Sequence, residues 1–133
     1  MAYQIISVII AAVLQNSGTI VFLGVKPNLV LSAVIPLIFF TNNFWRYFFI
    51  VFLPSVLLTS IPLWDLPIII FAVFSAIAYF AKDFLPWQSS FNNIILIIIG
   101  TVVINIAQFF PLEILYNVLI STGFYLAYAK NKL

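Results

Sequence analysis

Long apolar runs, separated by short clusters of polar residues and prolines, make up almost the whole chain. A bilayer core of about 30 Å is crossed by roughly 20 helical residues, so runs of this kind indicate transmembrane helices. Prolines and polar clusters mark the turns between them. Dividing the chain at these points predicts six spans, at residues 3–23, 29–40, 44–61, 67–81, 94–110 and 114–129.

The second predicted span, residues 29–40, is short for a crossing helix. A dozen residues rise only ~18 Å as a helix, which is less than a bilayer core requires. Pro36 lies within this span and predicts a kink. The segment is therefore expected either to cross as a short or tilted helix, or to be re-entrant and buried by its neighbours. The second case would leave five crossings.

Composition also indicates a membrane protein. Of the 133 residues, 65% are hydrophobic and 6% are charged, whereas soluble domains are about 45–50% apolar and about 25% charged. A soluble chain of this size would expose larger apolar patches than monomers tolerate. We therefore expect an all-α integral membrane protein, a compact bundle of about six transmembrane helices, with residues 1–133 forming a single multi-pass domain in contact with membrane lipid.

The distribution of basic residues predicts the orientation of this bundle. Cytoplasmic loops of membrane proteins carry an excess of Lys and Arg. With six crossings and both termini cytoplasmic, only Lys26 falls outside. The residues that then fall inside are Arg46, Lys82, Lys130 and Lys132.

The available side chains argue against catalysis. The chain contains no cysteine and no histidine, which removes thiol chemistry, the usual proton shuttle and the commonest metal ligand. Asp65, Asp83 and Glu113 are too far apart in the chain to predict a carboxylate pair. A glycine-rich phosphate loop is absent, and a net charge of +2 is too small to indicate nucleic-acid binding. We expect no enzyme activity, no cofactor and no bound metal.

Small and polar residues recur at helical spacing inside the predicted spans, as they do at helix–helix contacts in membranes. One such stripe lies on the last span, at Asn117, Ser121, Tyr125 and Tyr128. The residues predicted to form a helix interface or a partner-binding face are Gln15, Gly18, Pro27, Asn28, Thr101, Asn105 and Gln108. Three roles remain open: packing within the bundle, a polar ligand pocket formed by Gln15, Asn105 and Gln108, or contact with a partner helix.

Two stretches of the chain resemble the rod shape-determining protein MreD family. "LQNS" followed by "GVKPNLVLSAVI" is similar to the start of the family, and "YFAKDFLPWQSSFNNIILIIIGTVVINIA" is similar to its late section. The matching positions at the start are Leu14, Gln15, Ser17, Gly24, Pro27, Asn28 and Leu29. The third span departs from the family, since Pro54 and Ser55 lie where members have a glycine-rich helix leading to an aspartate.

The motif "GVKPN" also has a direct physical interpretation. Pro27 suits the first turn of the second helix, where its missing N–H is not needed. Gly24 suits the end of the first helix, and the Asn28 side chain can bond free backbone groups at the start of the second.

The resemblance implies a non-catalytic component of the bacterial cell-elongation machinery in the cell (inner) membrane. It would bind a bitopic protein such as MreC and help to position the peptidoglycan synthase complex. The family is also similar in fold to the substrate-binding S components of energy-coupling-factor transporters. The resemblance therefore implies an alternative function, a membrane subunit that binds a vitamin-like small molecule.

Overall fold

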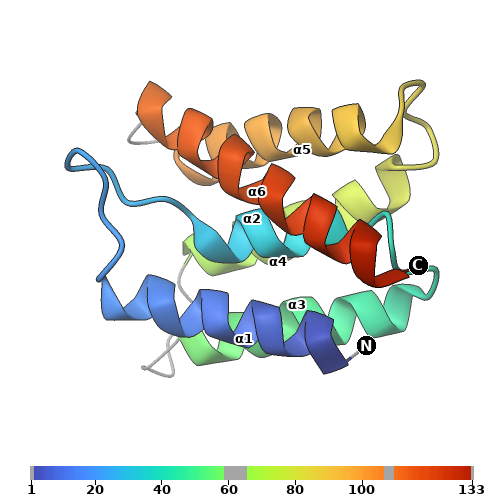
Figure 1. Ribbon diagram of the computed structural model, residues 1–133, viewed down its shortest axis with the longest axis horizontal. Coiled ribbons are helices and arrows are strands. Elements are labelled where there is room, and N and C mark those ends of the chain that lie inside the picture. Colours follow the sequence, from blue (N-terminus) through green and yellow to red (C-terminus); the bar gives the residue numbers. More distant parts are fainter. Residues whose placement is uncertain (1, 59–65, 107–109, 133) are drawn as a thin grey trace.

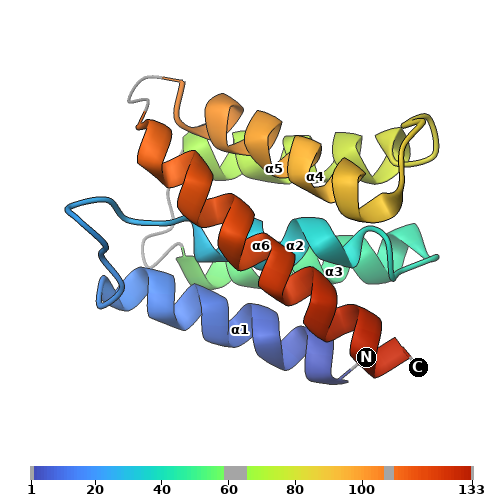
Figure 2. The ribbon, with the colours of Figure 1, turned by 45° about the horizontal axis from the view of Figure 1, so that its top comes forward.

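The computed structural model describes residues 2–58, 66–106 and 110–132. Within these ranges the regular structure is helical apart from one isolated β-bridge, which confirms the all-α class and the six predicted helices. The helices are α1 (Ala2–Ser17), α2 (Leu29–Leu37), α3 (Phe44–Leu58), α4 (Leu66–Ala81), α5 (Ser89–Ile104) and α6 (Pro111–Lys132). They alternate in direction, so both termini lie at the same end of the bundle, on the right of Figures 1 and 2.

The first helix ends earlier than the apolar pattern predicts. α1 stops at Ser17, because Gly18 follows with a φ of +66°, a left-handed conformation that terminates helices. Beyond it, Leu23 and Gly24 form a two-residue turn with positive φ values, and Phe22 and Val25 exchange two backbone hydrogen bonds of 2.9 Å. Gly24 therefore lies in this turn, and the prediction that it ends the first helix is wrong.

The second helix is the centre of the bundle. All nine residues of α2 are buried, and α2 contacts each of the other described helices (Figures 1 and 2). Nine residues rise about 14 Å. The next three residues, 38–40, continue as a tighter turn, in which each N–H donates to the carbonyl three residues earlier. Asn28 is the N-cap of α2, so Pro27 precedes the cap and does not lie in the first helical turn as predicted.

The last helix, α6, has buried polar residues and exposed leucines, which is the opposite of an amphipathic helix on the surface of a soluble protein. Glu113, Asn117 and Ser121 recur at every fourth residue of α6 and are buried. On its outer face, Leu119 and Leu126 are 61% and 63% exposed. A surface helix of a soluble protein turns its apolar face inward and its polar face to water. These three polar side chains of α6 are thus inside the bundle, and the leucines of the helix are outside.

Only α6, among the helices of the described residues, is both long and apolar enough to cross a membrane. Its apolar stretch runs over Pro111–Asn131, and 22% of the most apolar 18 residues of this stretch is buried in the bundle. The other apolar helices, α1, α3, α4 and α5, are shorter than this. At 1.5 Å per residue, a 16-residue helix such as α4 rises about 24 Å.

Candidate helix-interface site

Side chains from three parts of the chain bind the start of α2. The Asn28 Oδ1 accepts a hydrogen bond from the Leu31 N–H at 2.9 Å. The Gln15 Oε1, on α1, accepts from the Val30 N–H at 2.9 Å. The Asn28 N–H donates to Asn117 Oδ1, on α6, at 2.8 Å. Because the first N–H groups of a helix have no partner within it, these three acceptors satisfy donors that would otherwise be buried without a bond.

Asn117 links three helices at this point. Its Nδ2 donates to Thr101 Oγ1, on α5, at 3.0 Å, and its backbone carbonyl accepts from Ser32 Oγ, on α2, at 3.3 Å. Thr101 in turn donates its hydroxyl to the Ile97 carbonyl at 2.8 Å. Asn117 is fully buried. Both ends of its amide are thus engaged between α2 and α5, which holds these helices against α6.

A second polar contact joins the end of α5 to the start of α6. Asn105 caps α5, and its backbone N–H donates to the Thr101 carbonyl at 3.1 Å. Its Nδ2 donates to the Glu113 Oε1 at 2.8 Å. Glu113 is 8% exposed and lies in the first turn of α6, where the helix dipole favours a negative charge.

The structure therefore brings several of the predicted interface residues together within the chain. Gln15, Asn28 and Thr101 belong to the set of contacts around the start of α2, and Asn105 bonds Glu113. The remaining predicted residues have other positions. Gly18 ends α1, Pro27 is buried just before the α2 cap, and Gln108 lies outside the described residues.

Two residues that complete this site, Asn117 and Glu113, were not among the predicted site residues. Their signal in the sequence is the four-residue spacing of Glu113, Asn117 and Ser121, which places all three on one face of a helix. Ser121 bonds Asn93 of α5, with an Nδ2-to-Oγ distance of 3.0 Å. The polar face of α6 thus makes hydrogen bonds along the α5 contact.

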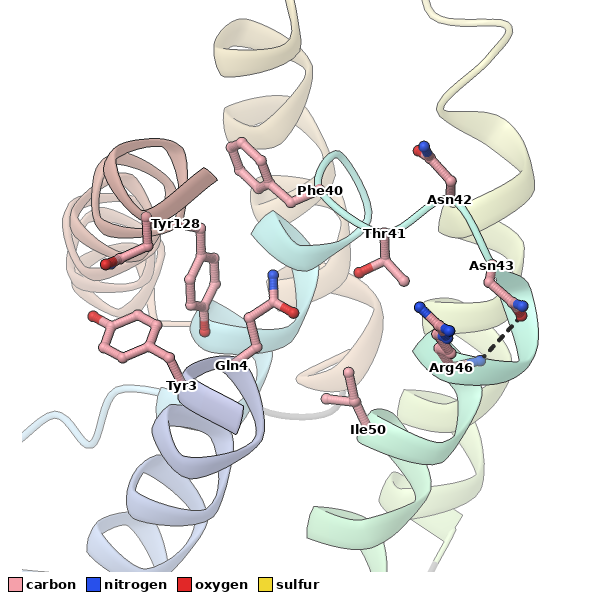
Figure 3. A pocket seen from close by; sticks show the side chains of 10 residues that line it. Tyr3, Gln4, Phe40, Thr41, Asn42, Asn43, Arg46, Ile50 and Tyr128 are labelled. Carbon is pink, nitrogen blue, oxygen red and sulfur yellow. Dashed lines mark hydrogen bonds between the residues drawn. The ribbon is translucent and has the colours of Figure 1, made fainter. Parts of the chain in front are cut away.

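Cavities of different size lie at the two ends of the bundle. Near Gln15 and Asn28, at the start of α2, the cavity has a volume of about 90 Å³. A pocket of about 410 Å³ opens at the other end, close to both termini, and Tyr3, Gln4 and Arg46 are among its lining residues (Figure 3). Ligand sites usually have volumes of about 300–1,000 Å³, so the smaller cavity is below this range.

The chemistry of the helix-interface site is that of a structural contact. Its amides and hydroxyls bond one another and the backbone, and Glu113 is its carboxylate. Among the described residues, no group of three or more His, Cys, Asp and Glu side chains is arranged to hold a metal ion. These contacts connect helices and leave little room for a substrate.

Comparisons with known proteins give no relative for this chain. A scan against protein families, a search of characterised proteins and a search of solved structures each found no match. A function for this chain is therefore inferred from its own residues and geometry.

Proposed function

We propose that this protein is a non-catalytic, multi-pass scaffold of the bacterial cell-elongation machinery, related to the MreD family. It would lie in the cell membrane with both termini cytoplasmic and bind a bitopic protein such as MreC. In this role the chain holds a partner's transmembrane helix in place beside the synthase complex and performs no reaction.

The main support for the membrane setting is that α6 buries polar side chains and exposes leucines. Asn117 and Ser121 are both fully buried, whereas Leu119 between them is 61% exposed. In water this arrangement would expose leucines and require burial of amides, at a cost in free energy on both counts. In a bilayer the same arrangement is favourable, because lipid solvates the leucines and polar groups must find partners inside the protein.

The support for a scaffold role is the outer face of α6, which is open and contains a glycine. Gly123 is exposed, a Cβ added there would have no neighbour within 4 Å, and Leu119 and Leu126 flank it on the same face. Small residues on a helix surface allow a second helix to approach closely in a membrane. Because the polar residues at the start of α2 are engaged within the chain, we place the partner helix on this outer face of α6.

The alternative, an S component that binds a vitamin-like molecule, requires a ligand-sized cavity open to the outside. In the proposed orientation, the described residues at the outer end of the bundle line a cavity of about 90 Å³ beside Gln15 and Asn28 and another of about 290 Å³ beside Leu14, Ile20 and Phe22. In the first of these cavities, Gln15 already bonds the Val30 N–H and Asn28 already bonds Asn117, and the second is lined by hydrophobic side chains. The scaffold role is therefore the better supported of the two functions.

Co-purification from bacterial membranes tests the proposal. We expect a bitopic coiled-coil partner to co-purify with the wild-type chain, and Gly123→Leu to abolish this while thermal stability in detergent is retained or slightly raised. Val73→Leu is the matched control, since Val73 is 53% exposed on α4, away from the proposed face. Depletion of the protein should round the cells. A purified chain that holds a stoichiometric vitamin-like molecule would overturn the scaffold role in favour of the S component.

A further inference from the structure

The open pocket at the end of the bundle where the two termini lie is lined by one arginine and by neutral hydrogen-bonding groups. Its volume is about 410 Å³, and Figure 3 shows side chains from both sides directed toward it. None of the ten described residues that line it is acidic. They are Tyr3, Gln4, Phe40, Thr41, Asn42, Asn43, Arg46, Ile50, Tyr128 and Asn131.

One hydroxyl in this pocket is buried without a partner. Thr41 is 8% exposed, and its Oγ1 makes no hydrogen bond. The rest of the residue is held in place, because the Thr41 carbonyl accepts a hydrogen bond from Lys82 Nζ at 3.2 Å. In Figure 3 the hydroxyl is directed toward the side of the pocket formed by Gln4. A buried hydroxyl left unpaired costs free energy, so a bound acceptor would stabilise it.

A second cavity adjoins this pocket and is apolar. It has a volume of about 250 Å³ and lies between α1 and α3. Arg46 and Ile50 line both cavities, and the other residues of the second are Ile5, Val8, Phe49 and Leu53. A polar pocket containing an arginine thus continues into a groove lined by hydrocarbon.

We propose that the two cavities together bind one anionic phospholipid. The Arg46 guanidinium and the Thr41 hydroxyl would donate to the phosphate, and an acyl chain would lie in the groove between α1 and α3. Arginine presents several N–H donors in a geometry that matches phosphate oxygens. Basic pockets between transmembrane helices on the cytoplasmic side bind lipid headgroups. Trp45, next to Arg46, is 66% exposed, as suits a side chain at headgroup level.

This inference rests on the membrane setting of the proposed function but not on the scaffold role. A free phosphate has the headgroup chemistry alone and would not need the groove. Binding of a phospholipid therefore depends on residues that contact only the acyl chain, whereas binding of free phosphate does not.

Native mass spectrometry of the delipidated protein in detergent tests the site, with dioleoyl phosphatidylglycerol as the probe. Dioleoyl phosphatidylcholine and inorganic phosphate are the comparison ligands. Arg46→Gln should weaken phosphatidylglycerol binding by about tenfold, the effect of losing one charge-assisted contact. Lys130→Gln, the same charge change near the same end on α6, should leave it unchanged. Leu53→Trp fills the groove and should also weaken binding, whereas Leu119→Trp, on the outer face of α6, should not. Thermal stability is measured for each variant.

Each outcome supports or overturns the site. Equal effects of Arg46→Gln and Lys130→Gln on phosphatidylglycerol binding would indicate general surface charge and overturn the site. Equal binding of the two lipids would show no selection for an anionic headgroup and would also overturn it. If inorganic phosphate bound as tightly as phosphatidylglycerol, and Leu53→Trp did not weaken its binding, the ligand would be a free anion. The proposal of a lipid site would then be wrong. A folded chain that binds no lipid but still co-purifies its partner overturns this inference and leaves the scaffold role standing. The converse result overturns only the scaffold role.

Discussion

At the scale of single residues, Asn117 shows how a polar side chain can stabilise an apolar bundle. Its Oδ1 accepts from the Asn28 N–H and its Nδ2 donates to Thr101 Oγ1, at 2.8 and 3.0 Å. Neither water nor lipid reaches this fully buried residue. The Asn117 amide therefore supplies the hydrogen-bond acceptor that water cannot supply to the buried start of α2.

Replacing Asn117 by leucine should be strongly destabilising. Asn117→Leu leaves the Asn28 N–H without an acceptor and inserts an apolar group into a polar contact. We expect the free energy of unfolding in detergent to fall by about 2–3 kcal/mol, near the upper end for a buried unpaired donor. Asn131→Leu is the control, because Asn131 is exposed and bonds only the Ala127 carbonyl of its own helix. Equal losses in the two variants would contradict the linking role of Asn117.

Gln15 and Asn105 should contribute to stability and not to partner binding. Each amide makes a contact within the chain, to the Val30 N–H and to Glu113 respectively. Gln15→Leu and Asn105→Leu should therefore each lower stability by about 0.6–2 kcal/mol, the range for polar contacts between helices in membranes. Thermal stability in detergent and co-purification of the proposed bitopic partner are measured together. Loss of the partner at wild-type stability would show that these amides face the partner instead.

At the scale of elements, α2 is fixed at both ends by other parts of the chain. Gln15 and Asn117 bond its first turn. At the other end, Lys82 Nζ donates to the Ile38 carbonyl at 3.0 Å and lies 4.1 Å from the centre of the Tyr79 ring. A cation at the C-terminal end of a helix is favoured by the free carbonyls there. A helix too short to be stable alone is thus held in a fixed position.

The elements could be predicted from the sequence far better than their contacts could. Apolar runs and breakers act over a few residues, so the six helices and the Asn28 cap were accessible from local pattern. The early end of α1 was missed, because the apolar residues continue past Gly18 into an irregular connection. The Asn28–Asn117 contact spans 89 residues, and no local pattern selects that partner among several possible amides.

Two glycines in neighbouring helices should respond to alanine in opposite directions. A Cβ at Gly100, on α5, would lie 2.6 Å from the Phe74 ring and 3.3 Å from Leu31, so Gly100→Ala must displace packed side chains. We expect a loss of about 1–3 kcal/mol, typical of overpacking. At Gly123 a Cβ meets open space, so Gly123→Ala should gain up to about 1 kcal/mol from helix propensity. Thermal unfolding of both variants in the same detergent checks this. A change in stability of the same sign in both variants would contradict the packing around Gly100.

At the scale of the whole molecule, the six helices alternate in direction and both termini lie at one end (Figure 1). The connection over residues 18–28 lies at the opposite end, and the open pocket beside Arg46 lies at the end with the termini. In the membrane setting that we propose, this arrangement would give six passes, with α2 as a short buried pass and its neighbours facing lipid. Arg46 and Lys82 would then lie on the same side of the membrane, which is the cytoplasmic side in the orientation that we propose.

Cysteine labelling tests this topology on a clean background, because the chain has no cysteine. Leu23 and Phe84 are both 85% exposed, and Asn42 is an exposed residue of the α2–α3 connection. With six passes and cytoplasmic termini, a membrane-impermeant maleimide should label Leu23→Cys in intact spheroplasts and label Asn42→Cys and Phe84→Cys only after permeabilisation. If α2 were re-entrant, the chain would return to the outside before α3. Asn42→Cys and Phe84→Cys would then both react in intact spheroplasts, and the proposal of six passes would be wrong.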